Sequence, residues 1–275
     1  MIKNWKKNTF YISIMQLTLL IVNFFLITII SREYGAEIYG EYASSKSLSV
    51  LIGTAIVMSL ALVVTKALAK NSEDSKLLFV NSYYIIIRNF FITLLILFPV
   101  TLLFQRDFSM TALFLMGFVF NELIHVALAF FQSRGDFVTS SKQIFVRTVL
   151  YGIGAWIIVL QGYSIIFLIV FQVFMLVLFF IIAHVSIPKN EKIFKTTSTP
   201  NVKTNLQKSG KKMVLTTFSS ALISELDIVL LGLFYSGSAL GVLAWSRRIL
   251  EIIFQLLAAS LDILFPELSK ANKRS

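Results

Sequence analysis

Long apolar stretches separated by short polar breaks dominate the pattern of the chain. A helix needs about 20 mostly apolar residues to cross the hydrocarbon core of a bilayer. By this measure the sequence predicts about eight transmembrane helices, over residues 9–30, 44–65, 78–104, 110–131, 144–160, 164–185, 213–235 and 239–265. We therefore expect an all-α, polytopic membrane protein.

The composition agrees with a lipid environment. Hydrophobic residues make up 57% of the 275 residues and charged residues only 14%, and the mean hydropathy is +0.81. A soluble domain carries about 25% charged residues, and one of this length could not bury so much apolar surface. The chain has no cysteine and two histidines, so the sequence gives no sign of a disulfide framework, a thiolate metal site or a cofactor.

Lysine and arginine are distributed unequally between alternate predicted loops. Eighteen lie on the side that carries both termini, whereas only Arg32 and Arg106 lie on the other side. Loops rich in these residues stay in the cytoplasm, so we expect both termini to be cytoplasmic. The net charge of +11 then reflects membrane topology, and no pattern of basic and aromatic residues points to nucleic acid as a partner.

The longest polar break covers residues 187–212. It is basic, contains Pro188, Pro200 and Gly210, and shows no apolar periodicity typical of a helix. This predicts a cytoplasmic linker between a first transmembrane unit, residues 1–186, and a second unit that starts in residues 213–275. The linker either lies solvated against an anionic membrane surface or binds an anionic lipid specifically.

A weak internal repeat joins the two predicted units. A displacement of 201 positions places Gly40, Ala43 and Ser45 on Gly241, Ala244 and Ser246. Both copies lie at an external turn that enters an inward-running helix. A repeat in this position has parallel topology about an axis normal to the membrane, which predicts two related bundles of six helices.

Several short motifs, taken in order, resemble the Wzx-type polysaccharide flippases, whose superfamily also holds the MATE multidrug exporters and the lipid II flippases. The motifs are the turn Tyr34-Gly35-Ala-Glu-Ile-Tyr39-Gly40-Glu-Tyr42-Ala43, then Gln132-Ser-Arg134-Gly135, Asp227-Ile-Val-Leu-Leu-Gly232, Trp245-Ser-Arg247-Arg248-Ile249 and Phe265-Pro266-Glu-Leu268-Ser269. The resemblance covers nearly the whole chain, and its order is more specific than any one motif.

The resemblance implies transport of polyprenyl-pyrophosphate-linked oligosaccharide repeat units across a bacterial inner membrane, for O-antigen or capsule synthesis, and no enzymatic activity. Two six-helix lobes would rock about a central cavity, driven by exchange of H⁺ or Na⁺. The chain departs from the family in one respect, because the family has twelve or more spans. We therefore expect a C-terminally truncated second lobe, completed by an oligomer or by another chain.

Ionisable residues inside the predicted spans are the first candidates for function, because each costs about 2.5 to 3.5 kcal/mol at a helix centre. Glu122, Glu225 and Glu251 fall near the midplane, whereas Lys46 and Arg147 fall near span ends, where their side chains could reach the interface. Five cations and five anions lie in or at the edge of spans: Lys46, Arg88, Arg147, Arg247 and Arg248, and Glu122, Glu225, Asp227, Glu251 and Asp262.

Arginines suit the pyrophosphate cargo that the resemblance implies, because a guanidinium binds phosphate oxygens with two parallel hydrogen bonds. Arg88, Arg247 and Arg248 are the candidates. Two alternatives stay open. Arg88 could instead reach the cytoplasmic surface, and Glu251, three and four residues from the other two arginines, could pair with either of them on one helix face.

The carboxylates could bind the coupling ion. Glu122 and His125 are three residues apart on one face of a helix, where they could relay protons or gate an ion, or join Asn121 in hydrogen bonds between helices. Glu225 and Asp227 point to different faces of their helix, so only one should face a cavity. Either could pair with Arg247 or Arg248 on the neighbouring helix.

Three other interpretations remain. The chain could be a nonfunctional or structural fragment of a transporter, or a multidrug or ion exporter of the same superfamily. A membrane glycosyltransferase is disfavoured because no large external loop could hold a catalytic site. No nucleophile elbow, P-loop or zinc motif is present in the sequence.

Overall fold

The described part of the molecule consists of α-helices and their connections. The structure is a computed structural model, and it describes residues 5–70, 75–103, 107–188, 200–235 and 237–271, with side chains in the last helix as far as Phe254. The helices are α1 (Trp5–Val57), α2 (Leu60–Ala69), α3 (Ser75–Leu103), α4 (Phe108–Ser133), α5 (Phe137–Leu160), α6 (Ile165–Ser186), α7 (Pro200–Phe234) and α8 (Ser238–Ala271). No strand occurs among these residues. The expected all-α fold is confirmed.

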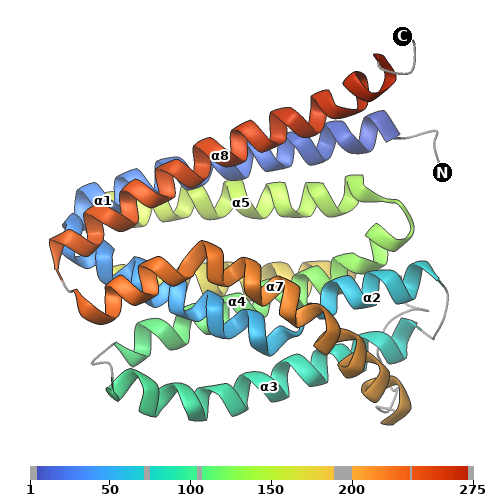
Figure 1. Cartoon of the computed structure of the whole chain (residues 1–275), viewed down its shortest axis with the longest axis horizontal. Helices are drawn as coiled ribbons and strands as arrows, with labels where there is room; N and C mark the ends of the chain where they lie inside the picture. Colours follow the sequence, from blue (N-terminus) through green and yellow to red (C-terminus); the bar gives the residue numbers. More distant parts are fainter. Residues whose placement is uncertain (1–4, 71–74, 104–106, 189–199, 236, 272–275) are drawn as a thin grey trace.

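Helix α1 contains two membrane-crossing legs that run in opposite directions. Gly35 interrupts it with φ 80° and ψ 165°, a conformation that side chains with a Cβ rarely adopt. The chain turns back on itself there, at the end of the bundle opposite to both termini (Figure 1). The two legs are the first two predicted spans.

The second leg of α1 is broken before it reaches the other end of the bundle. Met58 and Ser59 both have φ 52°, so the α-helical path stops after Val57 and resumes as α2.

Capping side chains mark the starts of three other helices. Asp107, Asp136 and Ser164 each accept a hydrogen bond from a backbone N–H in the first turn of α4, α5 and α6.

Helix α4 runs through the interior of the bundle, packed against α1, α2, α3 and α6. One apolar core gathers around α2, α3, α4 and α6, and a second lies among α1, α5, α6 and α8. Helices α7 and α8 each pack more closely against α1 than against each other. In Figure 1, α8 lies beside the first leg of α1, and both termini are at the same end of the bundle.

Two glycines that the internal repeat aligns lie where α1 and α8 approach each other closely. A Cβ on Gly40 would lie 2.8 Å from the backbone nitrogen of Gly241, and a Cβ on Gly241 would lie 1.7 Å from the carbonyl oxygen of Ala36. A second pair 201 positions apart also meets, since Arg248 contacts Ser47. Equivalent positions meet where an axis relates two copies, which supports the parallel repeat.

Six helical stretches of the described residues are long and apolar enough to cross a membrane, namely Tyr11–Ala69, Ser75–Pro99, Phe108–Ser133, Phe137–Leu160, Ile165–Ser186 and Val202–Gly232. The molecule is therefore a multi-pass membrane protein. The first stretch holds two predicted spans because Gly35 reverses the chain within it. The eighth predicted span corresponds to α8, where side chains beyond Phe254, including Asp262, lie outside the described residues.

One expectation is wrong in part. The predicted linker, residues 187–212, is not wholly irregular, because α7 starts at Pro200 and continues without interruption into the predicted span. Proline is favoured in the first turn of a helix, where its missing N–H has no partner to lose. The polar turns of α7 lack apolar periodicity because they extend the helix beyond the apolar stretch. Residues 189–199 lie outside the described residues.

Candidate functional site

Two adjoining cavities lie inside the bundle. One, of about 230 Å³, is lined by α1, α4, α5 and α6, and the other, of about 180 Å³, is lined by α1, α5, α6 and α8. They share Asn23, Lys46, Tyr151 and Gln172. We call the two together the central cavity.

Three cations line the central cavity. Lys46 comes from the second leg of α1, Arg147 from α5 and Arg248 from α8. Arg147 donates a hydrogen bond to the side-chain oxygen of Asn121 at 2.8 Å, and the Lys46 ammonium lies 6.0 Å from the centre of the Tyr42 ring. Neither cation forms a salt bridge with a carboxylate in the described part of the chain. Two positive charges are therefore held in membrane-spanning helices without a direct salt bridge, although Glu251 lines the same half of the cavity as Lys46.

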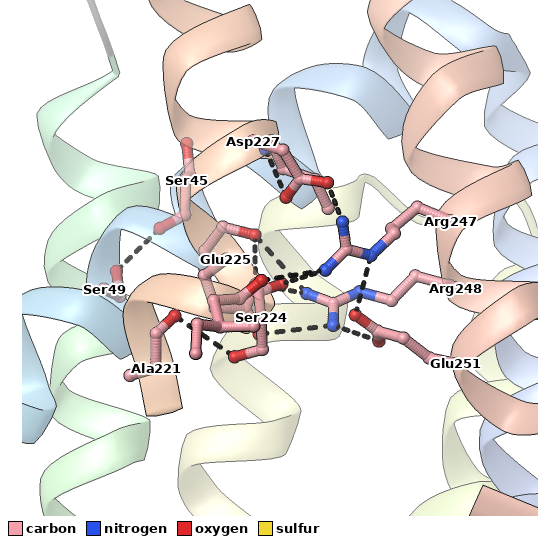
Figure 2. Close-up of polar contacts among 12 residues, drawn as sticks. Ser45, Ser49, Ala221, Ser224, Glu225, Asp227, Arg247, Arg248 and Glu251 are labelled. Atoms are coloured by element: carbon pink, nitrogen blue, oxygen red, sulfur yellow. Dashed lines mark hydrogen bonds and ion pairs between the residues drawn. The ribbon is translucent and has the colours of Figure 1, made fainter. Parts of the chain in front are cut away.

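Arg248 contacts residues of three helices (Figure 2). Its guanidinium donates to Glu225 of α7 and to Glu251 of α8, both at 2.7 Å, and it lies 3.4 Å from the hydroxyl of Ser47. Ser47 donates in turn to Glu225 at 2.6 Å. Side chains of Arg248 and Glu225 are only 16% and 8% exposed. This network joins α1, α7 and α8.

Arg247 points toward α7, away from the central cavity. It pairs with Asp227 of α7 and with Glu251, whose carboxylate lies 3.3 Å away. It also donates to the carbonyl oxygens of Ile223 and Ser224. Figure 2 shows the two arginines side by side, with Glu251 beneath both. We call Glu225, Asp227, Arg247, Arg248 and Glu251 the α7–α8 ion cluster.

The structure brings together five of the eight predicted site residues in this cluster. Both arginines have two carboxylate partners each, and Glu251 pairs with both of them and not with only one. Arg248 and Glu251 line the central cavity while paired. Glu225 and Asp227 pair with different arginines, as their spacing on different faces of α7 requires.

Arg88 lies apart from the other two candidate arginines. It lies on α3, where its guanidinium donates twice to the side-chain oxygen of its neighbour Asn89. Asn89 donates to the carbonyl oxygen of Ile56, at the end of α1. Arg88 lines neither part of the central cavity.

Glu122 and His125 line a different cavity, of about 520 Å³, between α1, α2 and α4 on one side and α7 on the other. We call it the α4–α7 cavity. Asn121, the third polar residue of this segment, faces the central cavity and accepts from Arg147. The three side chains therefore do not form one hydrogen-bonded group, although they are close in sequence. Among the described residues, no group of three or more His, Cys, Asp or Glu side chains could hold a metal ion.

Lys46 and Arg147 are the cavity-lining cations that sequence reasoning misplaced. Both fall near the edge of an apolar stretch, which suggested that they reach the membrane surface. The helices, however, start earlier than the apolar stretches, at Phe137 for α5 and directly after Gly35 for the second leg of α1. At about 1.5 Å per residue, Lys46 and Arg147 lie about 15 Å inside their helices. The sequence signal that could have found them is that both are ionisable residues inside predicted spans, where such residues are costly.

These features define a polytopic membrane protein with a polar, cationic interior. Residues 90–275 match the model of a family described as polysaccharide biosynthesis protein. The match covers more than half of the chain, and the chain belongs to this family. Comparison with curated proteins and with solved structures gives no match.

Proposed function

We propose that this protein moves a lipid-linked oligosaccharide, joined to polyprenol through pyrophosphate, across the bacterial inner membrane for surface polysaccharide synthesis. Both termini would be cytoplasmic, and the protein would act as a transporter and not as an enzyme. The family supports a role in polysaccharide biosynthesis. Substrate, membrane and direction are parts of the proposal.

One observation carries the proposal: Lys46 and Arg147 face a cavity inside the membrane-spanning bundle, and neither forms a direct salt bridge with a carboxylate among the described residues. A cation at this depth is costly, and ionisable residues inside membrane-spanning helices mark substrate and ion pathways. A pyrophosphate is an anion that these two cations would bind. Sugar hydroxyls would find hydrogen-bonding groups on Asn23, Asn121 and Gln172 in the same cavity.

Arg248 would take part in the second half of the cavity. It lines that half with Glu251, opposite Lys46. An arriving phosphate group would compete with Glu251 and Glu225 for the guanidinium, because each offers the same kind of oxygen acceptor. Loosening of the α7–α8 ion cluster by cargo would change how α7 and α8 sit on α1, which is the physical basis we propose for alternating access.

The test is a lipid-translocation assay in proteoliposomes, with a fluorescent polyprenyl-pyrophosphate-linked sugar as cargo. For the double variant Lys46→Gln with Arg147→Gln, we expect a loss of at least about tenfold in translocation rate, since two charge-assisted phosphate contacts of about 1.5 kcal/mol or more are removed. The variant should stay folded, because neither residue leaves a carboxylate unpaired.

Arg88→Gln is the matched control, since it removes an intramembrane arginine outside the central cavity. It should keep the wild-type rate. An unchanged rate in the double variant would overturn the assignment of the cavity to the phosphate. Absence of translocation by the wild-type chain would overturn the proposed function itself.

A further inference from the structure

Asn121 and Arg147 form a contact between two helices at the wall of the central cavity. Asn121 comes from α4 and Arg147 from α5, and both line the larger part of the cavity. The distance from the guanidinium nitrogen Nη1 to the side-chain oxygen of Asn121 is 2.8 Å. A guanidinium has donors only, so the oxygen of the amide and not its nitrogen must face it. The chemistry of the arginine thus fixes the orientation of the asparagine.

The contact leaves most of the Arg147 donors unused. A guanidinium carries several N–H groups in a planar fork, and Arg147 gives one of them to Asn121. Within the described residues Arg147 forms no other hydrogen bond and no salt bridge. Its remaining N–H groups are therefore available to a ligand in the cavity.

The acceptor that holds Arg147 is a neutral amide and not a carboxylate. A hydrogen bond between two ionised groups is about twice as strong as one between neutral groups, and a carboxylate would also cancel the charge of the arginine. Arg248 shows that alternative in the same cavity, since Glu225 and Glu251 both pair with it at 2.7 Å. An amide instead holds the guanidinium in place and leaves its positive charge for a ligand.

Helix α4 carries a carboxylate directly beside this amide, but on another face. Successive residues of an α-helix point in directions about 100° apart, so neighbours in sequence do not face the same space. Glu122 lines the α4–α7 cavity, whereas Asn121 lines the central cavity. A rotation of α4 by one residue would place the acid against Arg147. The observed orientation of α4 keeps the acid away from this cation.

We propose that Asn121 is a positioning residue, which orients the Arg147 guanidinium toward a phosphate group in the central cavity without a salt bridge that would compete with that group. This role rests on the proposed function, because the phosphate group is that of the cargo. It goes beyond that function in assigning the orientation and the available charge of Arg147 to one amide on another helix. A change at position 121 should therefore alter the affinity for phosphate through Arg147.

The experiment measures the Tm of the full chain in detergent while inorganic pyrophosphate replaces chloride at constant ionic strength. A ligand that binds only the folded state raises Tm with its concentration, so the wild-type Tm should rise and then level off. In the variant Asn121→Asp, a carboxylate replaces the amide and pairs with Arg147. Its Tm without pyrophosphate should be at least as high as that of the wild type. Its response should need at least about tenfold more pyrophosphate.

Asn23→Asp is the matched control. It places the same new charge in the central cavity, at a residue that has no hydrogen bond to Arg147 in the described part of the chain. The probe carries no sugar, so the sugar contacts proposed for Asn23 do not enter, and the response to pyrophosphate should change much less. Equal losses in the two Asp variants would show that added charge alone governs binding, and would overturn the proposal.

A double-mutant cycle separates positioning from a purely structural role of Asn121. Asn121→Leu keeps the approximate size of the side chain and removes the acceptor, whereas Arg147→Gln removes the cation. If Asn121 acts through Arg147, each single variant weakens the response, and the double variant responds as Arg147→Gln alone does. Losses that multiply in the double variant would overturn the proposal, as would a wild-type Tm that pyrophosphate does not change.

The outcome is separable from the proposed function because no lipid-linked cargo is present. Lipid translocation by a wild-type chain whose Tm does not respond to pyrophosphate would uphold the function and remove this role of Asn121. A response to pyrophosphate that depends on Asn121 and Arg147, without lipid translocation, would uphold the role in anion binding and remove the transport function.

Discussion

At the scale of single residues, Arg248 shows how a charge is retained inside the membrane. It satisfies two carboxylates on two helices at 2.7 Å each, with Glu225 only 8% exposed. A buried ion pair contributes little net stability against apolar residues of the same size, yet removing one partner leaves an uncompensated charge. The asymmetry makes Arg248 far less replaceable than an arginine at the surface.

We expect Arg248→Ala to lower the free energy of unfolding by about 3 to 5 kcal/mol, because Glu225 would remain buried without its cation. Denaturant unfolding of the purified protein in detergent measures this change. Arg32→Ala is the control, since Arg32 is 84% exposed and contacts Glu33 at 3.9 Å, and it should behave as wild type. Combining Arg248→Met with Glu225→Leu should recover part of the loss. No recovery would contradict the pairing.

Local pairing in this cluster was predictable, whereas its contact with α1 was not. The spacing of Glu251 from the two arginines predicts contacts within one helix, and both are present. Asp227 and Glu225 were open candidates for the same arginines, and the structure uses both. The contact of Arg248 with Ser47 depends on how α8 packs on α1, which no local pattern encodes.

At the scale of elements, helix boundaries decided which predictions were correct. Hydropathy marks only the apolar part of a helix. The helix itself can start in the polar sequence before that part, as α7 does at Pro200 and α5 does at Phe137. The positions of Lys46 and Arg147 were misjudged for this reason. The break after Val57 could not be predicted either, because neither proline nor glycine stands at it. The two residues with positive φ there, Met58 and Ser59, are of types that rarely adopt that conformation.

The contact between α1 and α8 gives a test of this packing. Gly241→Ala would place a methyl group against the backbone of Ala36, which has no flexible side chain that could move aside. We expect the two helices to separate locally, with a lower Tm and faster proteolysis of α8. Gly117→Ala is the matched control within α4, since its new Cβ would meet side chains only at 3.5 Å or more. Equal Tm values for both variants would contradict the close crossing.

At the scale of the whole molecule, the helices of the second predicted unit are held to the first by close apolar packing on α1 and by a few polar contacts. Ser59 of the α1–α2 break and Thr217 of α7 meet with their hydroxyl oxygens 2.8 Å apart, and Ser47 of α1 meets Glu225 of α7 at 2.6 Å. Alternating access requires that some of these contacts open and close. The division into units, 1–186 and 213–275, remains a prediction.

The chain has no cysteine, so a disulfide can be introduced without competing thiols. Ser59→Cys with Thr217→Cys places two thiols where two hydroxyls now touch. If α7 must move away from α2 during transport, oxidation should stop lipid translocation in proteoliposomes, and a reductant should restore it. Each single variant should be insensitive to oxidation. Full cross-linking with unchanged translocation would show that this contact stays closed throughout the cycle.

The wall between the two cavities is thin. Phe118 of α4 lines both, and it packs against Gly53 of α1, where a Cβ would lie 2.4 Å from the ring. Because the interior is closely packed, binding in one cavity that moves this ring would change the shape of the other. Thermodynamic reciprocity then applies: if a ligand in one cavity changes the binding affinity of the other cavity by some factor, a ligand in the second must change the affinity of the first by the same factor.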